Sequence, residues 1–233
     1  WRNTPPNYIT SVKNNMGDHI NSILTKDKLC RYVYTKLLDT DTVTTNVNEG
    51  KWNIIIGNTI SDDGWKDLYQ CIFSATVDSK LRSFQYQILK RSLVTNKFLC
   101  LCNIRDNDLC YFCNESCETI EHLLYDCKIV HTFWTKLSDI IHAAFNMRPY
   151  IVKRNVLLGT TNTGHDMLLN FIFVTGKRYI YVSRCLKKKL DVKAFMRILT
   201  DYYKIEKYSA NLKGKTWLRD KNGLPYTQSS MYK

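Results

Sequence analysis

The sequence predicts a mainly α-helical protein with an embedded zinc knuckle of three cysteine ligands and one histidine ligand. Cys110, Cys113, His122 and Cys127 follow the pattern Cys-x2-Cys-x8-His-x4-Cys. Both the spacing and the ligand types are those of closed structural zinc sites. On either side of this pattern, apolar residues recur every three or four positions, as they do along amphipathic helices.

The part of the chain before the zinc pattern is expected to hold three helices. They run from Asp18 to Leu38, from Ser61 to Phe73 and from Asp78 to Leu93. Residues 39–50 are rich in threonine, asparagine and aspartate, which predicts a loop. The apolar run Trp52–Ile56 is too short to assign to a helix or a strand, and residues 94–109 are interpreted as connecting turns.

A clear amphipathic helix follows Cys127 and is expected to end before Arg148-Pro149, because proline disfavours helix in the residue before it. A short apolar element at residues 156–159 and two helices, over residues 165–189 and 191–212, complete the chain. The expected segments are residues 1–60 with an irregular lead-in, a helix and a Thr/Asn-rich loop, residues 61–150 with helices and the zinc module, and residues 151–233 with a basic helical region and a mobile tail.

The local structure of the zinc pattern follows from its spacing. Asn114 succeeds the second cysteine, where a tight turn requires a left-handed residue. His122 and Cys127 would point about 140° apart on one continuous α-helix. We therefore expect a short helix capped by Thr119, with Cys127 on the bend that follows. A closed set of this kind predicts a folding element and not a catalytic metal.

Two alternatives to this zinc site remain open from the sequence. The chain has nine cysteines, so ordinary reduced thiols beside a surface histidine would also produce such spacings by chance. Cys117 lies inside the pattern and is a spare thiol that could replace one of the four ligands. The odd number of cysteines and their metal-type clustering favour a reducing compartment, so the cytoplasm and nucleus are the expected locations.

A strong positive charge points to a polyanionic partner. Thirty-four basic residues against 21 acidic ones give a net charge of +13, which favours RNA or DNA. No apolar run approaches the length of roughly 20 residues that spans a membrane, so no membrane partner is expected. Lys177, Tyr181, Arg184 and Lys188 share one side of the helix predicted at 165–189. This side is interpreted as a nucleic-acid-binding face, with a solvated helix face as the alternative.

Further basic residues are expected to extend this face. The additional candidates are Arg178, Lys187, Lys189, Lys80, Lys90, Arg91 and Lys97. Catalytic signals are weak by comparison, because the adjacent carboxylates Asp62 and Asp63 follow Ser61 and are typical of a capped helix start. The sequence shows no phosphate-binding loop, nucleophile elbow or His-Glu-x-x-His motif. No catalytic residue is assigned, and whether the segment is an enzyme stays open.

Several stretches resemble the zinc-binding region of LINE-type (non-LTR) retrotransposon reverse transcriptases. They are Leu81-Arg-Ser-Phe-Gln-Tyr-Gln-Ile-Leu-Lys90, Thr95-Asn-Lys-Phe-Leu99, the Cys110–Cys127 stretch, Phe133-Trp134, Asn170, Lys177-Arg-Tyr-Ile-Tyr181 and Ile205-Glu206. The four zinc candidates match the ligand positions of that family one by one. The presence of Cys117 and the lack of polymerase or endonuclease motifs depart from it.

The resemblance implies a C-terminal segment of a larger RNA-directed DNA polymerase that carries its endonuclease and polymerase domains upstream. In that family the segment is thought to bind template RNA or target DNA during target-primed reverse transcription. The alternative function is a structural module that docks on the upstream polymerase domain or on a host factor, with Trp134 and Trp217 as interface anchors. In either case, Cys113→Ser or a strong chelator is expected to unfold the region around residues 100–145.

Overall fold

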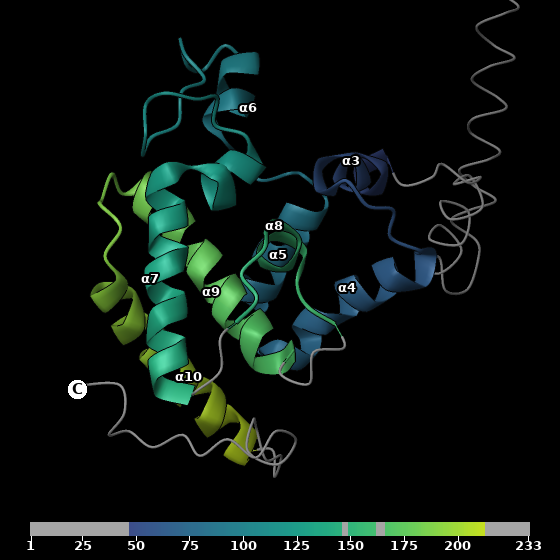
Figure 1. The fold of residues 1–233 in the computed structure, drawn as a ribbon, viewed down its shortest axis with the longest axis vertical. Coiled ribbons are helices and arrows are strands. Elements are labelled where there is room, and N and C mark those ends of the chain that lie inside the picture. Colours follow the sequence, from purple (N-terminus) through teal and green to yellow (C-terminus); the bar gives the residue numbers. More distant parts are fainter. Residues whose placement is uncertain (1–46, 146–148, 162–165, 213–233) are drawn as a thin grey trace, which may run out of the picture. The chain divides into compact units, whose positions relative to one another are not determined.

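The structure is a computed structural model that describes residues 47–145, 149–161 and 166–212 (Figure 1). Within these ranges the regular secondary structure is helical, apart from an isolated antiparallel bridge between Leu109 and Cys117. This confirms the predicted mainly α fold. The helix expected from Asp18 to Leu38 and the tail from residue 213 onward lie outside the described residues. The described residues between Asn48 and Leu212 belong to one compact unit.

Helix α4, at Asp62–Ala75, and helix α5, at Ser79–Leu89, begin where the sequence predicts helix starts, at Ser61 and Asp78. The Ser61 hydroxyl accepts a hydrogen bond from the Gly64 N–H at 3.2 Å. The Asp78 carboxylate accepts from the N–H groups of Lys80 and Leu81 at 2.6 and 3.2 Å. These side chains satisfy amide groups that have no partner inside the helix.

Two other helices correct the expectations for the same region. Helix α3 spans Val47–Ile56, so it begins inside the expected loop and contains the apolar run that was left unassigned. Its buried Trp52 donates a hydrogen bond from Nε1 to the Leu89 carbonyl at 2.9 Å, a tertiary contact invisible in the local pattern. Helix α6 spans Asn96–Leu101 and replaces the connecting turns expected there, because the Thr95 hydroxyl caps it.

In the described part of the chain, five helical elements follow the first two cysteines of the zinc pattern. They are the π-helix η1 at His122–Asp126, α7 at Lys128–Phe145, α8 at Lys153–Leu158, α9 at Asp166–Cys185 and α10 at Val192–Leu212. Helix α7 is described as far as Phe145, and the stop predicted before Arg148-Pro149 falls on residues 146–148, outside the described residues. Helix α8 includes most of the short apolar element expected at residues 156–159.

Helix α9 is the centre of the compact unit. It packs against α4, α5, α8, η1 and α10, and Figure 1 shows it between α7 and the pair α4 and α5. Every side chain from Leu168 to Lys177 is buried. This corrects the prediction of an amphipathic helix with one solvent-facing basic side. Helices from the expected segments 61–150 and 151–233 therefore share one core.

A close contact fixes the distance between α7 and α9. Trp134 lies over Gly176, and a Cβ atom added to that glycine would come within 2.6 Å of the Trp134 ring. The Trp134 ring also meets Phe173 edge-on, with ring centroids 5.9 Å apart. Its Nε1 donates a hydrogen bond to the Leu124 carbonyl at 2.9 Å. The same indole thus links α7, α9 and the turn that carries His122.

Candidate metal centre

The first two candidate ligands lie on a tight turn. The Asn114 N–H donates to the Cys110 carbonyl at 2.9 Å, and the Cys110 N–H donates to the Ser116 carbonyl at 2.8 Å. Asn114 has a φ of 53°, which confirms the predicted left-handed residue after the second cysteine. This turn places Cys110 and Cys113 on the same side of the loop, where their sulfur atoms approach a common point.

The other two candidate ligands lie at the ends of a π-helical turn. The Cys127 N–H donates to the His122 carbonyl at 2.9 Å, a hydrogen bond between residues five apart. The wider turn brings His122 and Cys127 together, although a regular α-helix would separate them. The expected short α-helix with a bend is therefore a π-helix, while the Thr119 hydroxyl accepts from the His122 N–H at 3.1 Å, as a capping residue does.

The four donor atoms lie close enough together to share one metal ion. The Sγ atoms of Cys110, Cys113 and Cys127 and a ring nitrogen of His122 lie within 4.8 Å of one another. The Cys110 and Cys127 sulfurs are 3.9 Å apart, and the Cys113 sulfur is 3.3 Å from His122 Nε2. Bonds of about 2.3 Å to sulfur and 2.0–2.1 Å to nitrogen give tetrahedral edges of about 3.5–3.8 Å. These residues therefore fit zinc.

Cys117, the spare thiol of the sequence, is not part of this group. It forms the bridge with Leu109 and is partly buried. Burial and a hydrogen bond with Asp108 raise the pKa of its thiol to about 11. A thiol held in its protonated form is a poor metal ligand, because the thiolate is the species that binds.

The surroundings of the buried sulfurs favour one thiolate before any metal binds. A hydrogen bond from the Cys110 thiol lowers the pKa of Cys127 to about 5, and the same bond together with burial raises the pKa of Cys110. Backbone N–H groups of Ile129 and Val130, in the first turn of α7, also stabilise the Cys127 thiolate. Cys110, Cys113, His122 and Cys127 would hold a divalent cation, which would take the place of the proton that Cys110 and Cys127 share.

Comparison with known proteins agrees with this geometry. Residues 47–134 match the protein family described as zinc-binding in reverse transcriptase. No curated protein and no solved structure matches the chain. The matched range contains all four candidate ligands, so this part of the chain is similar to the zinc-binding regions associated with reverse transcriptases, and zinc is the cofactor that its four ligands indicate.

Glu118 is the residue near the centre that sequence reasoning missed. It lies in the loop between Cys113 and His122, and its side chain has no exposed surface. Its carboxylate accepts hydrogen bonds from the backbone N–H groups of Asn96 and Tyr111 at 2.8 and 2.9 Å. Its ion pair with Arg184 measures 2.7 Å. The zinc loop is thereby joined to the start of α6 and the end of α9.

A second ion pair holds the other side of the zinc loop. Arg91 pairs with the buried Glu121 and lies over the ring of Trp52, 4.6 Å from its centroid. Burial acts to raise the pKa of Glu121, but the hydrogen bond from Arg91 holds it below its ordinary value. Arg91, a candidate for nucleic-acid contact, thus has a structural role.

Burial also corrects the assignment of two residues on the predicted basic face. The Lys177 ammonium group is fully buried and donates to Gln85 Oε1 at 2.5 Å and to the Leu157 carbonyl at 3.0 Å. Only 9% of the surface of Arg184 is exposed, and its guanidinium group donates hydrogen bonds to Glu118 and Asn96. Neither side chain is available to a phosphate. Their partners lie 92 and 66 residues away in sequence, which is why the helical pattern did not reveal them.

The remaining candidates lie closer to the surface. Lys80, Lys97, Lys187, Lys188 and Lys189 are exposed. Arg178 and Lys90 are partly buried, and Lys90 lies over the rings of Tyr69 and Tyr86. Tyr181, also half-buried, packs on Phe84 with ring centroids 5.5 Å apart. The structure therefore divides the predicted basic face into internal and outward-facing groups.

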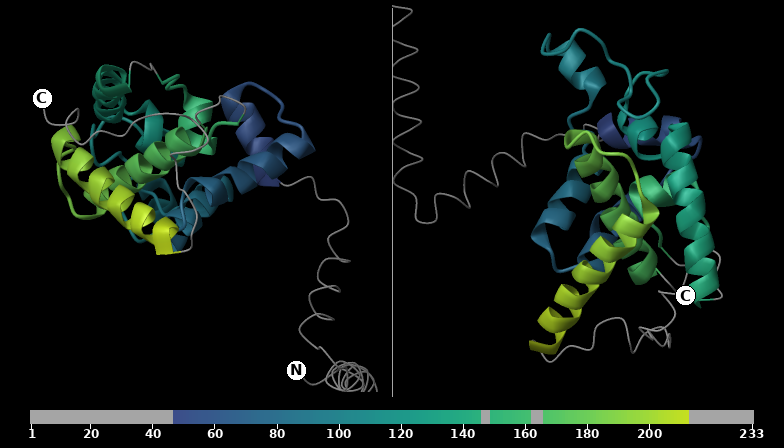
Figure 2. Two further views of the ribbon diagram at one scale, coloured as in Figure 1. Left: turned by 90° about the horizontal axis from the view of Figure 1, so that it is seen from below. Right: turned by 90° about the vertical axis from the view of Figure 1, so that its left-hand side faces the viewer.

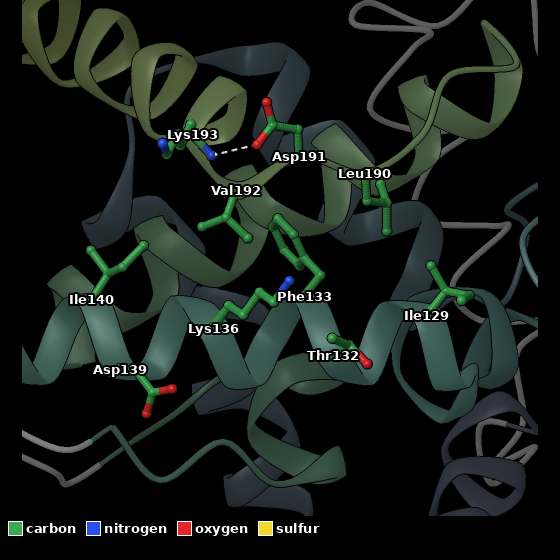
Figure 3. Close-up of a pocket in the computed structure, with 10 residues that line it drawn as sticks. All are labelled: Ile129, Thr132, Phe133, Lys136, Asp139, Ile140, Leu190, Asp191, Val192 and Lys193. Carbon is green, nitrogen blue, oxygen red and sulfur yellow. Dashed lines mark hydrogen bonds between the residues drawn. The ribbon is translucent and has the colours of Figure 1, made fainter.

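Two of the hollows lined by described residues are open to solvent and lie outside the metal centre. One, of about 470 Å³, is lined by Ser79, Lys80, Ser83, Phe84, Gln87 and Arg178, with no carboxylate among these residues. The other, of about 570 Å³, lies between α7 and the start of α10 (Figure 3). Its lining contains two cations, Lys136 and Lys193, and two carboxylates, Asp139 and Asp191. Most of its other lining residues are apolar. Of these two hollows, the first has a positive lining without a carboxylate.

The acidic pair considered for catalysis belongs to a helix start. Asp62 and Asp63 form the first turn of α4, after the Ser61 cap. The Asp63 carboxylate pairs with Lys66 at 2.9 Å, and both side chains are exposed. This agrees with the interpretation of a capped helix and an acidic first turn. None of the helices described is long and apolar enough to cross a lipid bilayer.

Proposed function

We propose that this zinc-stabilised module binds nucleic acid, as part of a LINE-type retrotransposon reverse transcriptase. Template RNA and target DNA are the proposed ligands, bound while the polymerase domain of the same polypeptide carries out target-primed reverse transcription. The match of residues 47–134 to zinc-binding regions of reverse transcriptases supports the polymerase context. The net charge of +13 supports an anionic ligand.

The observation that carries the proposal is a group of outward-facing cations beside the metal centre. Lys187, Lys188 and Lys189 follow directly after α9 and are all exposed. Arg184, one turn earlier, is bonded to Asn96 and Glu118, so this end of α9 lies against the start of α6. Lys97 follows Asn96 and is also exposed. The ion pair between Arg184 and Glu118 thus joins the end of α9, which the lysines follow, to the zinc loop.

The hollow between α5 and α9 extends this cationic surface. Lys80 and Arg178 face it with two serine hydroxyls and one glutamine amide, groups that commonly contact phosphate and sugar. Arg178 lies over the Phe84 ring, 5.4 Å from its centroid, which orients its guanidinium group. We name Lys80, Lys97, Arg178, Lys187, Lys188 and Lys189 together the outer basic surface. It is defined by charge and carries no signal for a particular base sequence.

A combined charge reversal tests the proposal. The triple variant Lys187→Glu/Lys188→Glu/Lys189→Glu of the full chain is compared with the natural protein by titrating fluorescent single-stranded RNA and duplex DNA. Counterion release predicts that affinity of the natural protein falls about a thousandfold or more between about 50 and 200 mM salt if six or more phosphates are contacted. The triple variant is expected to bind more than roughly tenfold more weakly and with a shallower salt dependence.

The matched control reverses one exposed charge away from this surface. Lys51→Glu on α3 is expected to bind as the natural protein does, since Lys51 lies outside the outer basic surface. Zinc content and melting temperature should be equal in all three proteins, because every changed side chain is exposed. An affinity that is independent of salt, or a triple variant that binds as tightly as the Lys51→Glu control, contradicts the proposed function.

A further inference from the structure

The outward face of α10 carries an apolar stripe with the spacing of a coiled coil. Ile198, Ile205 and Leu212 recur every seven residues, and Tyr208 lies three positions after Ile205. Ile205, Tyr208 and Leu212 are 61%, 66% and 70% exposed. A repeat at positions a and d of a heptad is the pattern with which one helix packs along another. Asp201 interrupts the stripe at one d position.

The opposite face of α10 is anchored, so the stripe cannot turn inward. Phe195 and Leu199 are buried in the core. The buried Glu206 carboxylate accepts hydrogen bonds from the Thr76 hydroxyl and, at 2.9 Å, from the Val77 N–H, in the turn between α4 and α5. Figure 2 shows α10 along the outside of the module. Its apolar stripe therefore stays directed away from the core.

A row of cations runs along one edge of this stripe. Lys193, Arg197, Lys204 and Lys207 are all exposed and are spaced so that they share one side of the helix. Lys193 shares its hollow with Asp139 and Asp191, and Lys204 lies 3.9 Å from Asp201 in a long and exposed contact. Arg197 and Lys207 form no salt bridge with the described residues, so they are the uncompensated cations of the row. A partner that covers the stripe therefore meets an apolar surface and, beside it, an edge of positive charge.

We infer that α10 docks an amphipathic helix of a partner protein, with an apolar a/d stripe and acidic residues along one edge. The positive charge beside the stripe argues against two other occupants, a second copy of the chain and the remaining segments of this sequence. In a second copy of the chain the cations would face either the same row, in an antiparallel pair, or Phe195, Tyr202 and Ser209, in a parallel pair, and neither set contains an acidic residue. Residues 1–46 and 213–233 of this sequence each contain more basic than acidic residues. The interruption by Asp201 and the narrow stripe favour a helix over a membrane surface, which requires a broad apolar face.

Two synthetic helical peptides test this inference on the full 233-residue chain. Both have about 21 residues, three heptads with leucine at a and d, and they differ only at e and g, where one carries glutamate and the other lysine. Fluorescence anisotropy should show that the glutamate peptide binds at least roughly tenfold more tightly. Arg197→Glu/Lys204→Glu is expected to reverse that preference, a result that loss of folding cannot produce.

Apolar variants locate the binding to the stripe. Ile205→Ser or Tyr208→Ser should weaken the glutamate peptide by roughly tenfold. Ile54→Ser is the matched control, because Ile54 is 82% exposed on α3. The inference is overturned if both peptides bind equally or not at all, or if Ile205→Ser binds like the control. The inference is also overturned if neither peptide binds and Ile205→Ser instead abolishes self-association, binding to anionic vesicles or binding to RNA.

Discussion

Burial of the Lys177 ammonium group makes the stability of the fold depend on pH. Burial lowers the pKa of Lys177 to about 7, from an ordinary value of 10.5. Between these values the unfolded chain holds a proton that the folded protein has released, so raising the pH favours the folded state. Below about pH 7 lysine is charged in both states and the full cost of burying the charge is present.

Lys177→Met is therefore expected to remove a rise in stability with pH. Between about pH 7 and 9, the free energy of unfolding of the natural protein should rise, relative to that of the variant, by up to about 1.4 kcal/mol per pH unit. Urea titrations of both zinc-loaded proteins across this range measure the difference, in which the contributions of the shared metal site cancel. If the difference in unfolding free energy between the two proteins is the same at every pH, Lys177 stays charged in the folded protein.

Individual residues differ in how far the sequence reveals them. The zinc ligands were predicted because all four lie within 18 residues of chain, from Cys110 to Cys127, and metal chemistry constrains their types and spacing. Lys177 and Arg184 were assigned to a surface because helical periodicity cannot show that Gln85 and Glu118, far away in sequence, receive them. In a sequence, buried cations with distant partners therefore show the same helical spacing as an exposed basic face.

Helices α3 and α9 each contain a glycine, and the two positions should respond to alanine with opposite signs. Alanine normally stabilises a helix interior by roughly 0.5–1 kcal/mol relative to glycine. At Gly50 in α3 nothing lies within 4 Å of an added Cβ. At Gly176 in α9 the added Cβ meets Trp134 at 2.6 Å, in a core without space to yield.

Gly50→Ala is expected to raise the free energy of unfolding by roughly 0.5–1 kcal/mol, and Gly176→Ala to lower it by roughly 1–3 kcal/mol. Chemical denaturation of both variants provides the measurement, each serving as the control for the other. A stabilised Gly176→Ala protein would mean that α7 and α9 separate without cost, contrary to the close contact between Trp134 and Gly176.

Element boundaries followed local chemistry where a capping side chain determines them. Ser61 and Asp78 are read directly from the sequence, and α4 and α5 begin after them. Helix α6 was interpreted as turns although Thr95 caps it, because a six-residue helix has too little periodicity to recognise. The π-turn of η1 replaces an expected α-turn because closure of the metal site, and not backbone propensity, decides the local geometry.

The whole compact unit should depend on zinc. The metal site joins η1 to α7, while Glu118 and Glu121 join its loop to α9 and α5. Loss of the metal leaves Leu123 and Leu124, both fully buried, without a fixed turn. The effect should therefore exceed the region around residues 100–145 that the sequence pattern alone indicated, and reach α4, α5 and α9.

Removal of the metal tests this dependence. Cys113→Ser, or a strong chelator, is expected to abolish a zinc content of one ion per chain and to lower the melting temperature of a single cooperative transition. Hydrogen exchange should then become faster in α4 and α9 as well as in η1. Cys102→Ser is the control, since this exposed thiol is not a ligand. Protection that persists in α4 and α9 of metal-free protein would confine the role of zinc to the loop.

The ion pair between Glu118 and Arg184 has a consequence for the order in which a ribosome delivers this fold. All four metal ligands have been synthesised by Cys127, but Arg184 is incorporated 66 residues after Glu118. At about 5–20 residues per second, that interval lasts between about 3 and 13 s. If the nascent chain binds zinc in this interval, the metal holds the loop closed before Arg184 is available to pair with the Glu118 carboxylate. Zinc would then stabilise the loop during translation as well as in the folded protein.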